Sequence, residues 1–210
     1  MMTYLNANYL TLEQLADKTN IAIKNIENLI KYNCIPKHSH RVICQTVFET
    51  AVFDNTVIID GEKLYYHPSL INWIITAEEY RKNMDFAKTA EKIKSDFTLE
   101  LHKALINADI KKYIANINIE EYIQKQWLDV MSGSYGVCLK EISVKNIVDK
   151  AIAVSVLEKW LEAEKPKLNE EQHRDILDMA KLYDQISADF GPHEISKSTR
   201  GRLYDVFMNT

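Results

Sequence analysis

The chain has 210 residues, of which 46% are hydrophobic, 27% charged and 10% aromatic, and its formal net charge is −4. This ordinary globular mixture excludes intrinsic disorder, a collagen-like repeat and a small disulfide-stapled fold. The acidic balance argues against a protein that coats a polyanion. Only five glycines and four prolines are present, which favours helix over a loop-rich β fold.

The cysteines and the N-terminus indicate a cellular compartment. Cys34, Cys44 and Cys138 form a sparse set of odd number, unlike a secreted disulfide framework. The first residues lack the basic and apolar regions of a signal peptide, and no apolar run is long enough to span a membrane. The sequence therefore predicts a cytoplasmic protein with no membrane contact.

Two short helices are expected near the N-terminus. Thr11 and Gln14 have the spacing of a capping box and open a helix with an apolar face. A second helix is expected from Ala22, with apolar residues three and four apart. It has to end by Ile35, because Pro36 disfavours helical geometry in its predecessor.

A β-hairpin and a third helix are expected next. The segment 41–53 is rich in β-forming residues, and Thr56–Ile59 meets Leu64–Tyr66 across Asp60-Gly61. Asp-Gly between two such runs favours a tight type I′ turn. Pro68 suits the start of a further helix. This order of elements indicates a winged helix-turn-helix.

Residues 9–36 resemble the MerR-type helix-turn-helix. The family's Leu-Ala pair matches Leu15-Ala16, its turn matches Thr19-Asn20-Ile21, and its closing motif matches Asn33-Cys34-Ile35-Pro36. The resemblance implies that residues 1–83 form a winged module of a DNA-binding transcription regulator. The candidate DNA contacts that it implies are Lys24, Asn25, Asn28, Lys37 and Arg41.

The charge balance of residues 1–83 argues against DNA binding. Residues 1–83 contain eight basic and nine acidic side chains, whereas affinity for DNA depends on the number of Lys and Arg residues that neutralise phosphates. The stretch at the expected recognition helix, Lys24-Asn25-Ile26-Glu27-Asn28, contains no arginine. We therefore interpret the module as a packing or protein-contact unit, with DNA binding as the alternative.

The segment 84–210 is expected to form an antiparallel helical domain. Apolar residues recur every three or four positions, and Asn118 with Glu121 and Asn169 with Gln172 are capped starts. The expected elements are a long helix from Phe86 to about Ala104, a helix from Asn118 to Val130, a loop at Ser132–Gly136, a helix that ends before Pro166, a helix that ends at Gly191-Pro192, and a short helix from about Ser198 to Met208.

Most of the chain also resembles an uncharacterised bacterial family that is sometimes labelled as associated with natural-product biosynthesis. The resemblance rests on Tyr65–Pro68, on Trp127 followed by Gly133–Lys140, and on Ser198–Arg202. It implies a bacterial accessory protein and carries over no functional residue.

Cys34, His38, His40 and Cys44 are all residue types that can bind a metal ion, and they lie within eleven residues of one another. Their spacing is too compact for the paired knuckles of a zinc site. Cys34 lies in the apolar stretch just before Pro36 and is expected to be a small buried hydrophobe. The two histidines are expected to be exposed loop residues. We expect no metal and no cofactor.

The best candidate ligand site combines a glycine loop with the C-terminal arginines. Backbone N–H groups at Gly133–Gly136 and the guanidinium groups of Arg200 and Arg202 would hold an anion, with Trp127 and Tyr135 as walls. For the loop by itself, we favour a plain helix connection that needs glycine for its turn geometry over an anion-binding loop. Cys138 is expected to be structural, because a nucleophile requires a positioned base.

The sequence thus predicts a mainly α protein, in which a winged helix-turn-helix of residues 1–83 precedes a helical domain of residues 84–210. The leading function is a non-enzymatic bacterial accessory or regulatory protein that binds a protein partner or a small ligand, as a homodimer. The alternatives are a MerR-like transcription regulator and an enzyme with a site near Gly133–Gly136.

Overall fold

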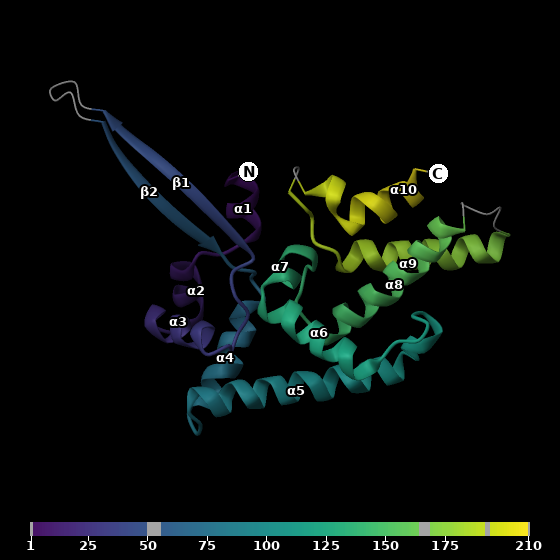
Figure 1. Ribbon diagram of the computed structural model, residues 1–210, viewed down its shortest axis with the longest axis horizontal. Coiled ribbons are helices and arrows are strands. Elements are labelled where there is room, and N and C mark those ends of the chain that lie inside the picture. Colours follow the sequence, from purple (N-terminus) through teal and green to yellow (C-terminus); the bar gives the residue numbers. More distant parts are fainter. Residues whose placement is uncertain (1, 50–55, 164–168, 192–193, 210) are drawn as a thin grey trace.

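The computed structural model describes residues 2–49, 56–163, 169–191 and 194–209, with backbone alone for 44–49 and 56–60. Its described part is mainly helical with one two-stranded antiparallel sheet (Figure 1). The first helix, α1 (Met2–Asn8), was not expected from the sequence. It has no capping signal, and it packs Leu5 and the following Tyr9 against Tyr65.

The two short helices are confirmed as α2 (Leu12–Thr19) and α3 (Ile23–Lys31). Thr11 and Gln14 form the expected capping box. Asn20 ends α2 in the left-handed conformation, where its N–H donates to the carbonyl of Ala16, and asparagine tolerates that conformation better than most residues. The chain therefore reverses within three residues between α2 and α3.

The hairpin is present, but its expected turn is wrong. Strand β1 (His40–Glu49) pairs with β2 (Thr56–Tyr65), and Asp60 and Gly61 lie inside β2 opposite Gln45 and Cys44. A turn at Asp60-Gly61 would pair only a few residues, whereas the observed register pairs ten with ten. Because cross-strand pairs stabilise a sheet, the longer register outweighs the local turn preference. The connection falls at residues 50–55, outside the described residues.

The hairpin reaches away from the helices as a two-stranded ribbon (Figure 1). At its base, Leu10 and Tyr66 form an antiparallel bridge through N–H···O bonds of 2.9 and 2.8 Å. The base is further held by Tyr65, whose hydroxyl donates to Asn6 Oδ1 at 3.0 Å. The ribbon is therefore anchored to the segment just before α2 and to α1.

The third helix and the long amphipathic helix are confirmed as α4 (Leu70–Arg81) and α5 (Phe86–Asn107). Asp85 caps α5 by accepting from the N–H of Lys88 at 2.8 Å. After a short 3₁₀ turn, η1 (Ile110–Lys112), α6 (Ile119–Met131) begins at the expected cap, Asn118, and lies along α5.

The segment expected to be a loop at Ser132–Gly136 is in part helical. Gly133 ends α6 in the left-handed region, and α7 (Ser134–Cys138) follows directly. Glycine at this position closes a helix without a steric cost. The correction is therefore small: the connection is two residues long, Ser132 and Gly133, and a short helix forms the rest of the segment.

The C-terminal half is an antiparallel helix pair with a helical cap. Helices α8 (Val144–Glu162) and α9 (Glu170–Ile186) pack together, and α9 has the expected Asn169–Gln172 capping box. Helix α9 ends before the predicted Gly191-Pro192, because Ser187 leaves the helix to form a β-bridge with Leu139. The chain ends in a 3₁₀ turn η2 (Ile195–Lys197), a π-helical turn η3 (Arg200–Tyr204) and α10 (Asp205–Met208).

One hydrophobic core runs across most of the chain. It joins Leu15 and Ile26 of the N-terminal helices to Leu101 of α5 and Ile147 of α8. Each of these four side chains is at most 1% exposed. The division at residue 83 stays a prediction, and this core crosses it.

A polar contact set ties the base of the hairpin to the C-terminal half. The Tyr9 hydroxyl donates to the carbonyl of Gly136 at 3.1 Å, and the Tyr4 hydroxyl donates to the carbonyl of Asp189 at 2.5 Å. His40 Nδ1 lies 3.8 Å from a carboxylate oxygen of Glu194.

Within the residues described above, no helix is long and apolar enough to cross a membrane.

Candidate functional site

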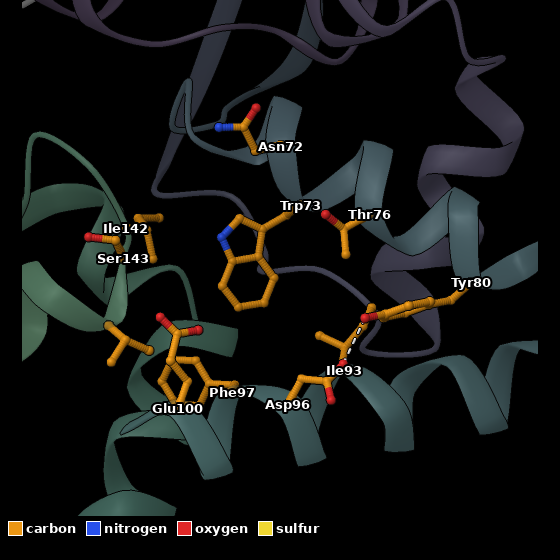
Figure 2. Close-up of a pocket in the computed structure, with 11 residues that line it drawn as sticks. Asn72, Trp73, Thr76, Tyr80, Ile93, Asp96, Phe97, Glu100, Ile142 and Ser143 are labelled. Atoms are coloured by element: carbon orange, nitrogen blue, oxygen red, sulfur yellow. Dashed lines mark hydrogen bonds between the residues drawn. The ribbon is translucent and has the colours of Figure 1, made fainter. Parts of the chain in front are cut away.

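A cleft opens where α4, α5 and the start of α8 meet (Figure 2). We call it the α4–α5 cleft; its volume is about 350 Å³. Its walls come from two consecutive helices, α4 and α5, and from a third segment about forty residues further along the chain. The lining residues are Asn72, Trp73, Thr76 and Tyr80 of α4, Ile93, Asp96, Phe97 and Glu100 of α5, and Ile142, Ser143 and Val144 at the start of α8.

Aromatic rings form the floor and middle of the cleft. Figure 2 shows the Trp73 indole in the centre, with Phe97 below it. The two ring centroids are 6.4 Å apart at an interplanar angle of 44°, and Phe97 in turn lies 5.4 Å from Trp127. Because Phe97 is buried against Trp127, it holds a fixed position beneath the indole. The apolar floor is therefore preformed.

Two carboxylates of α5 line the cleft at different ends. Asp96 accepts hydrogen bonds from the Tyr80 hydroxyl, at 2.7 Å, and from Lys92 Nζ. The Lys92 bond lowers the pKa of Asp96, and the bond to Asp96 raises the pKa of the Tyr80 phenol. Glu100 forms no ion pair with any described residue, and Figure 2 shows its carboxylate below the Trp73 indole. One carboxylate is thus neutralised and the other is available.

Helical spacing explains why these side chains meet. Trp73, Thr76 and Tyr80 are three and four residues apart, so they share one face of α4. Asp96 and Glu100 are four residues apart, which places both carboxylates on one face of α5. This site was not predicted from the sequence, because Trp73 and Phe97 fall in the apolar patterns of their helices and look like ordinary core residues. The available signal was the pair of acidic residues on the face that also carries Phe97.

The glycines of the predicted anion loop are packed against the chain before β1. Gly133 has φ +86°, and a Cβ atom there would lie 2.4 Å from the carbonyl oxygen of His38. A Cβ at Gly136 would lie 2.0 Å from Ser39 Oγ. These glycines permit close approach of two segments, and the N–H of Lys37 donates to the carbonyl of Met131 at 3.0 Å beside them.

The other residues of that predicted site have partners of their own. Trp127 is buried, and the Tyr135 hydroxyl donates to Gln126 while Lys150 Nζ lies 5.9 Å from the Tyr135 ring centroid. Arg200 pairs with Asp184 and covers the Tyr204 ring, and Arg202 is exposed. Among the described residues, no hydrogen bond or ion pair joins these arginines to Gly133–Gly136. Anion binding there stays a prediction.

The candidate DNA contacts are distributed over α3 and the start of the hairpin. Lys24 is largely exposed and lies 3.6 Å from Glu27, and Asn25 is exposed beside it. Asn28 is half-buried, and Lys37 is exposed. Arg41 Nε lies 2.6 Å from a carboxylate oxygen of Glu62. Two of the three basic side chains are therefore already paired with acids.

The residues considered for a zinc site lie in different surroundings. Cys34 is buried and its thiol donates to the carbonyl of Phe86 at 3.4 Å, and burial raises its pKa to about 11. The expectation that His38 and His40 are exposed is wrong: both are half-buried, and the His40 ring contacts Tyr9 at 4.4 Å. Aromatic neighbours supply this burial, which a single sequence does not reveal. Within the described residues, no group of three or more His, Cys, Asp or Glu could hold a metal ion.

These features define a mainly helical protein with a projecting antiparallel hairpin and one aromatic, acidic cleft. The chain belongs to a family of unknown function (DUF6058), which matches residues 83–209. The match begins after α4, so it does not cover the segment that resembles MerR-type proteins, and that resemblance stays a prediction. Neither the curated proteins nor the solved structures that were compared with the chain gave a match.

Proposed function

We propose that the chain is a non-enzymatic accessory or regulatory protein that binds a small ligand in the α4–α5 cleft and acts as a homodimer. In this proposal residues 1–83 are a winged helix-turn-helix module that serves for packing and protein contact. The observation that carries the proposal is the cleft itself, because α4 supplies one wall from this module and α5 and α8 supply the others. A ligand there contacts both parts of the chain.

The chemistry of the cleft favours a ligand that carries a positive charge on a flat apolar body. Trp73 and Phe97 offer aromatic surface, and Glu100 adds a carboxylate that lacks a basic partner among the described side chains. Aromatic faces attract ammonium groups, and a nearby carboxylate adds to that attraction. The volume of about 350 Å³ lies at the lower end of the range for small-molecule sites. A protonated aryl-alkyl amine fits these conditions.

Ligand binding in this position would link the two parts of the chain. A molecule between α4 and the start of α8 stabilises the arrangement in which both walls are in contact with it. Ser69, just before α4, already accepts from the N–H of Ile142 through its hydroxyl at 3.1 Å. The ligand would add a second contact beside this hydrogen bond and so couple its binding to the position of the N-terminal module.

The test compares benzylamine, benzyl alcohol and benzoate, which share a ring and differ in charge. Ligand-observed NMR and tryptophan fluorescence should give affinities in the order amine, alcohol, acid. Glu100→Gln should weaken binding of the amine about tenfold and leave the affinity for the alcohol unchanged. Glu158→Gln, at an exposed position of α8, is the matched control. Equal binding of all three probes, or no effect of Glu100→Gln, would refute the proposal.

A second candidate function is DNA binding by the N-terminal module. The exposed outer face of α3, with Lys24 and Asn25, follows α2 after a tight turn and favours this reading. The ion pairs of Lys24 and Arg41 oppose it, because DNA phosphates would have to displace Glu27 and Glu62. Fluorescence anisotropy with duplex DNA at physiological salt tests it, and Lys24→Glu must abolish any signal if α3 is the contact. Enzymatic chemistry at Gly133–Gly136 has less support, because the backbone of His38 packs against Gly133 and the side chains of Ser39 and His67 pack against Gly136.

A further inference from the structure

The projecting hairpin has two outer strand edges. Within the described residues its sheet contains only β1 and β2, so each strand is paired along one edge and has an outer edge along the other. Figure 1 shows both strands reaching away from the helices. A two-stranded ribbon is marginally stable by itself in water, and a strand edge with unpaired N–H and C=O groups is a template for another strand. The ribbon therefore has room for a further strand.

Backbone hydrogen bonds show which residues face each outer edge. The carbonyl of Tyr65 accepts from the N–H of Ser39 at 2.9 Å, whereas both backbone groups of Tyr66 bond to Leu10. Tyr65 thus faces β1, and Tyr66 faces away from it. Because backbone groups alternate along an antiparallel strand, the continuous register extends this pattern through the ribbon. The outward residues, whose N–H and C=O groups point to the outer edge, are Arg41, Ile43, Gln45, Val47 and Glu49 of β1 and Thr56, Ile58, Asp60, Glu62 and Leu64 of β2.

The outer edge of β2 is unsuited to pairing with a second copy of itself. Such a pair needs outward residues opposite outward residues, which excludes the full-length register and leaves two that come close to it. One sets Asp60 opposite Asp60 of the second copy, and the other sets Asp60 opposite Glu62. Like charges directly opposite each other destabilise a sheet. Leu10 also occupies the base of this edge through its bridge to Tyr66.

The outer edge of β1 is complementary to itself. One of its two near-full registers sets Arg41 opposite Glu49 of the second copy, at two symmetric places. The same register sets Ile43 opposite Val47 and places Gln45 on the two-fold axis. Opposite charges and apolar pairs at such positions stabilise a sheet. Proline and lysine, which protect natural strand edges, are absent from this strand.

The described side chains at the base of β1 are accessible to a second copy. Ile43 is 70% exposed, and the side chain of Arg41 is 54% exposed with its Nε 2.6 Å from Glu62. A guanidinium group has five N–H donors, so Arg41 can keep Glu62 and also bind a second carboxylate. The other face of the ribbon packs against α1 through Val42 and Tyr65.

We infer that two copies of this chain join through the outer edge of β1, in antiparallel register about a two-fold axis at Gln45, and form one four-stranded sheet. This is an isologous contact, in which the same edge serves both partners. The helices of the two copies then lie at opposite ends of the sheet, because each ribbon reaches away from its own helices. The inference rests on the self-association proposed above and is independent of the ligand in the α4–α5 cleft.

The first test removes one outward N–H group. Gln45→Pro deletes a donor at the axis and spares the bonds within the ribbon, because proline is tolerated where the N–H of an edge strand faces solvent. Asp60→Pro is the matched control: it lies directly opposite Gln45 and faces the other outer edge. Size-exclusion chromatography with light scattering on the full-length protein should show dimers for the unmodified protein and Asp60→Pro, and a monomer for Gln45→Pro.

The masses have two outcomes that contradict the inference. A monomeric unmodified protein up to about 1 mM protomer would overturn both the inference and the self-association. A dimer that survives Gln45→Pro and is lost in Asp60→Pro would place the second copy on β2 and overturn this inference alone. Far-UV circular dichroism shows that each variant is folded.

The second test exchanges charges and does not depend on proline. Arg41→Glu should weaken the dimer at least tenfold, because it sets like charges opposite each other at two symmetric places. Adding Glu49→Arg should restore the dimer. Positions 41 and 49 of one chain are about 26 Å apart in an extended strand, so a contact within the chain does not explain the rescue. A dimer that ignores Gln45→Pro and both charge variants would place the interface elsewhere and overturn this inference alone.

The third test fixes the register. The proposed pairing sets Cys44 opposite Thr46 of the second copy as a non-hydrogen-bonded pair, whose Cα atoms are about 4.5 Å apart, a distance that a disulfide spans. Thr46→Cys should therefore form a covalent dimer under mild oxidation, and Thr46→Cys with Cys44→Ser should not. Equal yields from the two variants would contradict the register. Benzylamine binding, measured in the monomeric Gln45→Pro variant, shows separately whether the cleft functions.

Discussion

Replacing Gly133 by alanine should destabilise the protein substantially, because two independent costs meet at this position. The residue has φ +86°, and the left-handed region costs a residue with a Cβ about 1–2 kcal/mol. The new Cβ would lie 2.4 Å from the carbonyl oxygen of His38 and 2.9 Å from that of Lys37. Both are backbone atoms, so relief requires a shift of the chain, at about 1–3 kcal/mol.

The expected loss in the free energy of unfolding is therefore about 2–5 kcal/mol. For a chain of this size the melting temperature should fall by roughly 5–15 °C. Urea denaturation followed by far-UV circular dichroism measures the loss directly. Ser134→Ala, at the exposed next residue, is the control and should change stability by less than about 0.5 kcal/mol.

An asparagine at the same position separates the two costs. Asparagine tolerates the left-handed region, but its Cβ meets the same carbonyl oxygens. Gly133→Asn should therefore recover only about 1 kcal/mol relative to Gly133→Ala. A Gly133→Ala protein within about 0.5 kcal/mol of wild type would refute the reasoning that this glycine exists for close packing against the segment before β1.

Three further outcomes are expected. Tyr9→Phe should lower the free energy of unfolding by about 1–2 kcal/mol in urea denaturation, because the buried carbonyl of Gly136 loses its 3.1 Å hydrogen bond; no loss would contradict a stabilising contact between the segment after α1 and α7. Arg41→Ala should cost less than about 1 kcal/mol, since its pair with Glu62 is exposed, and a larger loss would show a role beyond that pair. Burial lowers the pKa of His67 to about 4 from 6.5, so the unfolded chain takes up the proton first. As pH falls from about 6.5 to 4, the free energy of unfolding should therefore decrease by up to about 3 kcal/mol through this group. His67→Gln should flatten that part of the plot of unfolding free energy against pH, and an unchanged slope would exclude the imidazole as its source.

Local signals in the sequence predicted helix starts well. The Thr11–Gln14 and Asn169–Gln172 boxes act over three residues, so their side chains and backbone partners are adjacent whatever the rest of the fold does. The hairpin turn is decided differently. The Asp60-Gly61 pair has a local preference for a turn, but ten cross-strand pairs form only when residues 40–49 pair with residues 56–65. These contacts between segments determine the register.

The candidate site depends still more on distant contacts. Trp73, Phe97 and Glu100 each follow a readable helical pattern, but nothing within one helix indicates that the start of α8 closes the third wall. For Gly133, the residue type correctly predicted an unusual backbone conformation, but the reason for it is the close approach of His38, which lies far earlier in the chain. Neither His38 beside Gly133 nor the start of α8 beside the cleft could be predicted from the local sequence.

The continuous core has a consequence for how this protein can be divided. Leu15 and Ile26 pack in the same cluster as Leu101 and Ile147, on either side of residue 83. A fragment cut there would expose buried aliphatic surface on both pieces, and each piece would be prone to aggregate. The region matched by the family begins at this position. A shortened protein designed on that boundary should therefore express poorly, whereas the two halves produced together as separate chains should associate and refold as one body.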